Sequence, residues 1–185
     1  MILLSLLLAS SYLLRFLIVV DSSPQISGAS EQATFENGQN KIMEAYGRIA
    51  NNQIQNGSVS WIQAGLWYLT ISDNNNGNNK SAYFYTDFSM VRPDGSSMHK
   101  HSIENFKSTT INLEGERIII RGIADIDSGN SQDYQDIPII VNLKDNTVLG
   151  LIIDIDKTQQ HFASSNANEI FGILIDSRSL ANLII

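Results

Sequence analysis

The stretches VSWIQAGLWYLTI (59–71) and SAYFYTDFSMVR (81–92) indicate the fold class, because their side chains alternate in character at every second position. A period of two is typical of β-strands, in which successive side chains point to opposite faces. The polar stretch SDNNNGNNK (72–80) between them is rich in residues that form turns. Both stretches are therefore predicted to be strands, with Trp61 and Trp67 packed in the core. One face of the first stretch carries Trp61, Gln63, Gly65, Trp67 and Leu69, and the more apolar face of the second carries Ala82, Phe84, Thr86, Phe88 and Met90.

The rest of the chain repeats this pattern at short intervals. Turn signals recur roughly every 8–12 residues, which favours a sandwich or a barrel over βαβ units. No stretch after residue 30 has the period of an amphipathic helix. We therefore expect an all-β fold, an antiparallel β-sandwich of jelly-roll or Ig type, formed by a single domain over residues 30–185. Further strands are predicted at 42–50, 97–104, 107–113, 116–126, 136–144, 147–156 and 169–176.

The N-terminus has a different composition. The segment MILLSLLLASSYLLRFLIVV (1–20) is almost entirely apolar, and a polar stretch at residues 21–32 follows it. This order, with small residues at 27–29, is typical of a secretory signal peptide. About 20 apolar residues are also enough to span a bilayer, so a membrane anchor is the alternative. We expect residues 1–29 to be a signal peptide or an anchor. The domain would then be secreted, or attached through residues 1–20 to the outer face of the cytoplasmic membrane.

Composition excludes several classes of function. The chain of 185 residues has 19 acidic and 12 basic residues, a net charge of −7 and no cysteine. An acidic surface repels phosphate backbones, so we expect no nucleic-acid partner. Without cysteine, the chain forms no disulfide and offers no thiolate to a metal. It also has no GxSxG elbow and no glycine-rich phosphate loop.

The three histidines of the chain provide a specific lead. His99 and His101 are two residues apart in a predicted strand, so their side chains point to the same face. His161 would complete a three-nitrogen site that suits zinc or copper, with water in the remaining position. Glu104 is predicted to be a further ligand or an outer partner that fixes an imidazole tautomer. The alternative is that His99 and His101 are solvated and that His161 lies in an unrelated loop.

Several short motifs carry a resemblance to known proteins. They are WIQAGLW (61–67), FSMVRPDGSSMHKH (88–101), RGIADID (121–127), QQHF (159–162) and EIFGILID (169–176). Their order resembles that of uncharacterised exported β-sandwich proteins of ammonia-oxidising archaea, over roughly residues 42–176. This resemblance implies an extracytoplasmic β domain in a copper-dependent physiology, without an established reaction. The HxH…H order also resembles α-type carbonic anhydrases and the first cupin motif, over too few residues to imply an activity.

Two hypotheses of function follow from the sequence. The first is an extracytoplasmic protein that binds copper or zinc through His99, His101 and His161, for storage, for delivery or, more boldly, for hydration or hydrolysis at an open zinc ion. The second is a structural or adhesive cell-surface domain without catalytic activity. The distance between His161 and the HxH strand distinguishes them, because a remote His161 leaves the ion without its third ligand.

Overall fold

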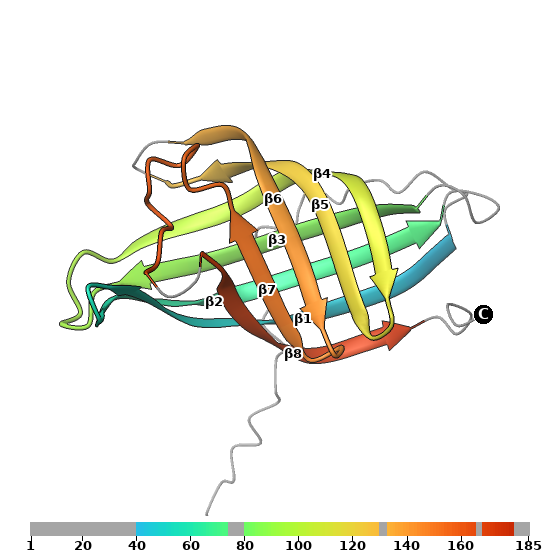
Figure 1. Ribbon diagram of the computed structural model, residues 1–185, viewed down its shortest axis with the longest axis horizontal. Helices are drawn as coiled ribbons and strands as arrows, with labels where there is room; N and C mark the ends of the chain where they lie inside the picture. The colour runs from blue at the N-terminus through green and yellow to red at the C-terminus, as the bar shows by residue number, and fades with distance from the viewer. Residues whose placement is uncertain (1–39, 74–79, 130–132, 166–167, 180–185) are drawn as a thin grey trace, which may run out of the picture. The chain divides into compact units, whose positions relative to one another are not determined.

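Eight antiparallel β-strands close into a barrel in the computed structural model, which describes residues 40–73, 80–129, 133–165 and 168–179 (Figure 1). Each strand pairs with the next along the chain, and β1 also pairs with β8. The predicted leader, residues 1–29, lies outside the described residues. Within the described ranges, no helix is long and apolar enough to cross a membrane. The strands are β1 (Asn40–Gln55), β2 (Ser58–Asp73), β3 (Lys80–Val91), β4 (His99–Glu114), β5 (Arg117–Asp127), β6 (Tyr134–Lys144), β7 (Val148–Ile153) and β8 (Ile170–Ser179).

The expected β-sandwich is wrong, because the sheet closes on itself. β1 and β8 pair from Met43↔Ser179 to Ile49↔Gly172, and we call this pairing the closing seam. A sandwich would instead pack two separate sheets face to face. Both architectures need one apolar face on each strand, so the alternation of side chains does not distinguish them.

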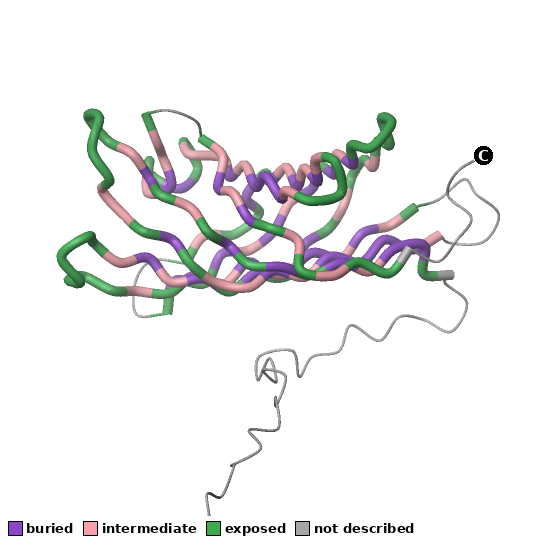
Figure 2. The backbone as a smooth tube through the Cα atoms, turned by 90° about the horizontal axis from the view of Figure 1, so that it is seen from below, coloured by how far each residue is buried: buried purple, intermediate pink, exposed green. Residues whose placement is uncertain are grey.

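The predicted alternation itself is confirmed. All five residues of the apolar face of 81–92 are buried, and along the first stretch Gln63, Trp67 and Leu69 are buried too. Figure 2 shows the same alternation of buried with less buried positions along the backbone. Trp67 is 1% exposed and belongs to the core, whereas Trp61 is partly buried and packs against the core. The barrel interior is thus filled by side chains from the predicted faces.

Several predicted strand boundaries differ from the structure; β1, predicted at 42–50, extends from Asn40 to Gln55. The stretches 97–104 and 107–113 form the single strand β4, because the β4–β5 register shifts between Glu104 and Lys107 while the pairing continues. Such a bulge interrupts the alternation of side chains without ending the strand. The predicted strand 147–156 is shorter in the structure, where β7 ends at Ile153. Asp154 Oδ1 accepts hydrogen bonds from the backbone N–H groups of Asp156 and Lys157, which forms a turn.

Two glycines let Trp67 lie against the closing seam. A Cβ atom added to Gly47 would lie 2.6 Å from Cε2 and Cζ2 of Trp67, and it would also overlap the carbonyl oxygen of Ile173. A Cβ atom added to Gly172 would lie 3.0 Å from Nε1 of Trp67. The indole therefore occupies space that side chains on β1 and β8 would otherwise take. Glycines within strands often mark such a close approach.

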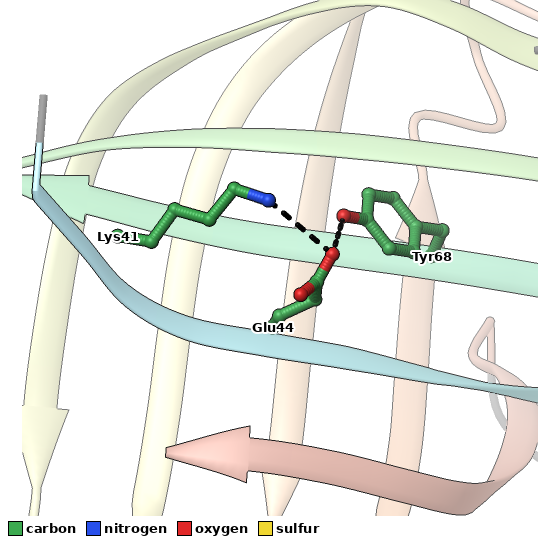
Figure 3. Close-up of polar contacts among 3 residues, drawn as sticks. All are labelled: Lys41, Glu44 and Tyr68. Carbon is green, nitrogen blue, oxygen red and sulfur yellow. Dashed lines mark hydrogen bonds and ion pairs between the residues drawn. The ribbon is translucent and has the colours of Figure 1, made fainter. Parts of the chain in front are cut away.

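The outer face of β1 carries a separate polar group. Tyr68 donates its hydroxyl to the Glu44 carboxylate, and Lys41 Nζ lies 3.4 Å from the same carboxylate (Figure 3). The hydrogen bond from Tyr68 is the main cause that lowers the pKa of Glu44, while burial and this bond raise the pKa of Tyr68 to about 12. A hollow of about 190 Å³ adjoins the group, and none of the predicted metal ligands lines it. Its lining residues are Glu44, Tyr46, Asp176 and Arg178.

Candidate metal centre

The strand register places His99 and His101 in two successive layers at one end of the barrel. β4 begins at His99, and its first residues pair with the end of β3. Paired residues of neighbouring strands point to the same face of a sheet, so both imidazoles point to the buried side. Polar side chains gather in the outer of the two layers. Cross-strand pairing aligns Asn51, Gln63, Met90 and His99 in this layer, and Ile49, Gly65, Phe88 and His101 in the next.

The three histidines lie close enough together to hold a metal ion. His161 Nε2 is 3.0 Å from His101 Nε2 and 3.2 Å from His99 Nε2. All candidate ligand atoms of His99, His101 and His161, hereafter the histidine cluster, lie within 4.8 Å of one another. Tetrahedral zinc, with Zn–N bonds of about 2.0–2.1 Å, separates two nitrogen ligands by roughly 3.4 Å. The two spacings from His161 Nε2 therefore differ from that geometry by only a few tenths of an ångström, while the His99–His101 pair lies within 4.8 Å.

Hydrogen bonds on the outer nitrogens orient two of the rings. His99 Nδ1 lies 2.9 Å from the carbonyl oxygen of Ser97, which can only accept, so Nδ1 carries the proton. In the neutral ring, the Nε2 atom of His99 then carries a lone pair that can bind a metal ion. His101 Nδ1 lies 2.9 Å from Ser128 Oγ. The backbone N–H of Ser128 in turn donates a hydrogen bond to Asp133 Oδ1. If Nδ1 donates its proton to this hydroxyl, the lone pair of His101 Nε2 is free for a metal ion.

Contacts to β1 hold the segment that carries His161. The side-chain amide of Gln53 donates to the carbonyl oxygen of His161, at 3.1 Å, and to that of Ala163. The backbone N–H of Ser165 donates to the carbonyl oxygen of Ile54 at 2.8 Å. Figure 1 shows this segment, between β7 and β8, on the same side of the view as the loop that leads into β4. The third imidazole is thus brought to the HxH strand by interactions with a strand more than 100 positions away in the sequence.

Aromatic rings surround the histidine cluster on several sides. The ring centroid of Phe162 is 5.0 Å from that of His101, and the centroid of Phe88 is 5.5 Å from it. Trp61 meets His99 edge-on at 4.9 Å. Such apolar surroundings lower the local dielectric and disfavour charged imidazoles. We call Trp61, Phe88 and Phe162 the aromatic wall.

Burial keeps the inner imidazoles neutral. His101 is 2% exposed, and burial lowers its pKa to about 3, with smaller contributions from His161 and His99. The pKa of His161 is lowered in the same direction, mainly by burial and then by His99. Metal ions bind the neutral form of imidazole. His101 and His161 are therefore held in the protonation state that binding requires.

The same burial predicts a pH dependence of stability in the chelator-treated chain. An imidazole of the unfolded chain titrates near pH 6.5, while folded His101 titrates near 3. Between these values the unfolded state binds more protons, so the free energy of unfolding falls as the pH falls. The steepest slope is about 1.4 kcal/mol per pH unit for this one group. Urea unfolding at a series of pH values would measure it, and His101→Gln should flatten the curve. Equal slopes in both proteins would contradict the prediction.

Glu104, the predicted fourth participant, does not join the cluster. It is exposed and accepts a hydrogen bond from Ser102 Oγ at 2.8 Å. Because it is three positions from His101 in a strand, its side chain points to the opposite face. The residues that do support the ligands, Ser97, Ser128 and Gln53, were not predicted. Their contacts with the histidines are visible only in the folded structure, and the sequence carries no local motif for them.

Ser128 is expected to tune metal affinity. Replacing it with alanine removes the hydroxyl that orients His101, and the loss of such an outer partner typically lowers affinity about 10- to 100-fold. Competition with a chromophoric chelator would measure this for Zn²⁺. Ser102→Ala, which changes a serine of β4 that binds Glu104 instead, serves as the matched control. An unchanged affinity in Ser128→Ala would show that the hydroxyl does not position the ligand.

Comparisons with known proteins assign the chain to no family. Neither protein-family models, nor curated proteins, nor solved structures gave a match to the chain. The resemblance to exported archaeal proteins therefore stays a prediction. The histidine cluster, three side chains from two parts of the chain that could hold a metal ion, is the feature from which a function can be inferred.

Proposed function

We propose that the chain is a metal-binding barrel that holds one Zn²⁺ or Cu²⁺ ion through the Nε2 atoms of His99, His101 and His161. The observation that carries this proposal is the convergence of three Nε2 atoms, with His161 Nε2 at 3.0 and 3.2 Å from the other two. One proton on His161 Nε2 can serve only one of these two contacts fully. A metal ion accepts all three lone pairs at once, so it suits the arrangement better than hydrogen bonds do.

The ligand types narrow the choice of metal. Three neutral imidazoles suit zinc, copper and nickel, whereas magnesium and calcium prefer oxygen ligands. Zinc and copper are the ions that we propose. Three protein ligands leave a coordination position for water or a small ligand, as in catalytic rather than structural zinc sites. Storage or delivery of the ion is the role that needs nothing more than this site.

The proposed place of action is outside the cytoplasm. The support for it is the apolar segment 1–20, which is typical of a signal peptide or an anchor. An exported protein of this kind would meet free or loosely bound metal ions in its surroundings. Detection of the chain in a membrane or extracellular fraction of cells that express it would test the location.

Metal content by mass spectrometry tests the site. The full chain is exposed to Zn²⁺ or Cu²⁺, freed of excess ion and analysed beside His99→Ala/His101→Ala. Lys100→Ala/Ser102→Ala changes intervening positions of the same strand and is the matched control. We expect about one ion per chain in the wild type and the control, and a loss in the histidine variant. Metal content that is absent, or indifferent to the histidines, would favour a structural surface domain instead.

A further inference from the structure

We propose that the metal centre presents its open position to a small monovalent anion, such as a carboxylate, and that Arg92 favours this ligand. The inference rests on the proposed metal site and adds the class of molecule that the site receives. It follows from the charge of the ligands, from the surroundings of the histidine cluster and from the place of Arg92.

The ligand set carries no negative charge. Within the described ranges, the cluster contains three histidines and no carboxylate, so a bound divalent ion would keep its full charge of two. The outer partners of two rings are neutral as well, a carbonyl oxygen on His99 and a hydroxyl on His101. Carboxylate partners would make the imidazoles more basic and the ion less electrophilic. An ion held by this set therefore stays strongly electrophilic.

The surroundings of the cluster solvate a charge poorly. Phe88 and Phe162 are 1% and 4% exposed, and both lie against His101. Beside such an apolar wall, an anionic ligand that neutralises part of the charge of the ion is favoured over neutral water. His99 and His161 are only partly buried, which places the two outer ligands nearer to solvent than His101. We infer that a ligand approaches from their side.

A cation, Arg92, lies against the indole ring that contacts His99. The guanidinium carbon of Arg92 lies 4.7 Å from the ring centroid of Trp61, and that ring lies edge-on to His99 at 4.9 Å. Arg92 is exposed, so its charge is partly screened by solvent. In a chain of net charge −7, this cation gives the approach to the metal centre a locally favourable field for an anion.

Met90 is the protein group that would compete for the open position. It is paired with His99 across β3 and β4, it is fully buried, and thioether sulfur is a ligand for copper. Its Sδ atom, however, lies 3.6 Å from the side-chain amide of Gln63, which donates to it. This contact directs the sulfur toward Gln63 on β2. We therefore assign the open position to an exogenous ligand.

Titration of sodium azide into the Co²⁺-loaded full chain tests the inference, because the visible absorption of cobalt reports changes in its ligands. Sodium chloride keeps the ionic strength constant. We expect a saturable spectral change, with the half-saturating azide concentration raised about twofold to fivefold in Arg92→Gln, the range for one exposed charge. Lys100→Gln removes an exposed cation from an outward position of β4 and should leave half-saturation nearly unchanged. Cobalt content should be equal in all three proteins.

The possible results separate the two proposals. A spectrum that ignores azide while cobalt is bound would overturn the inference and leave the metal site intact, and Met90→Leu would then show whether sulfur fills the position. Equal half-saturation in wild type and Arg92→Gln would overturn the role of Arg92. Failure of the chain to bind cobalt, zinc or copper would refute the proposed function and the inference with it.

Discussion

Zinc is expected to stabilise the folded chain by about 2.7 kcal/mol when the free ion is at 100 times its dissociation constant, and by about 4.1 kcal/mol at 1,000 times. The reason is that His161 reaches His99 and His101 only after the barrel has formed and the segment between β7 and β8 has docked on β1. The unfolded chain offers at most the local HxH pair. Urea unfolding with and without Zn²⁺, at constant pH, would measure the difference.

His161→Ala is the informative control for this prediction. It leaves the HxH pair in place and removes the only ligand that depends on tertiary structure, so most of the stabilisation by zinc should disappear. Glu104→Gln should keep it, because the Glu104 side chain lies outside the cluster. Stabilisation of equal size in His161→Ala would show that zinc binds elsewhere and would contradict the three-histidine site.

Trp67→Ala is expected to lower the free energy of unfolding by about 3–5 kcal/mol, the range for removing a large aromatic side chain from a core. Trp67 is 1% exposed and fills the space beside Gly47 and Gly172 on the two closing strands. Its loss would leave a cavity at the closing seam. Urea unfolding followed by circular dichroism would measure the effect in the chelator-treated protein, so that metal binding does not contribute.

Trp67→Phe separates the packing of the ring from the cost of its unpaired N–H group. The buried Nε1 atom of Trp67 has no hydrogen-bond partner among the described residues, and such a group costs about 1–3 kcal/mol. Phenylalanine removes that cost and keeps much of the ring, so its effect should be clearly smaller than that of alanine. A loss below about 1 kcal/mol in Trp67→Ala would show that the indole does not support the seam.

The strands could be predicted from the sequence, but the closure of the sheet could not. Alternation along 59–71 and 81–92 identifies the buried faces because it depends only on the local period of a strand. Pairing of β1 with β8 instead brings Gly47 and Gly172, which lie more than 100 positions apart, beside the same indole of Trp67. A glycine in a strand pattern signals a close approach, but it does not name the partner.

The same distinction applies to the metal centre. The shared face of His99 and His101 follows from their spacing in a strand, and the structure confirms that they lie together. The position of His161 could be proposed only from the small number of histidines, since it depends on how Gln53 and Ile54 hold a long connection. Glu104 was expected at the site because it is near in sequence, but the strand places it on the other face.

The most direct test of the metal centre is a crystal structure of the zinc-loaded chain with anomalous diffraction measured at the zinc absorption edge. We expect one strong anomalous peak per chain, bonded to Nε2 of His99, His101 and His161 at about 2.0–2.1 Å. Density for a non-protein ligand should occupy the remaining position. A peak at another place, or His99, His101 and His161 without a peak in zinc-saturated crystals, would contradict the three-histidine metal centre.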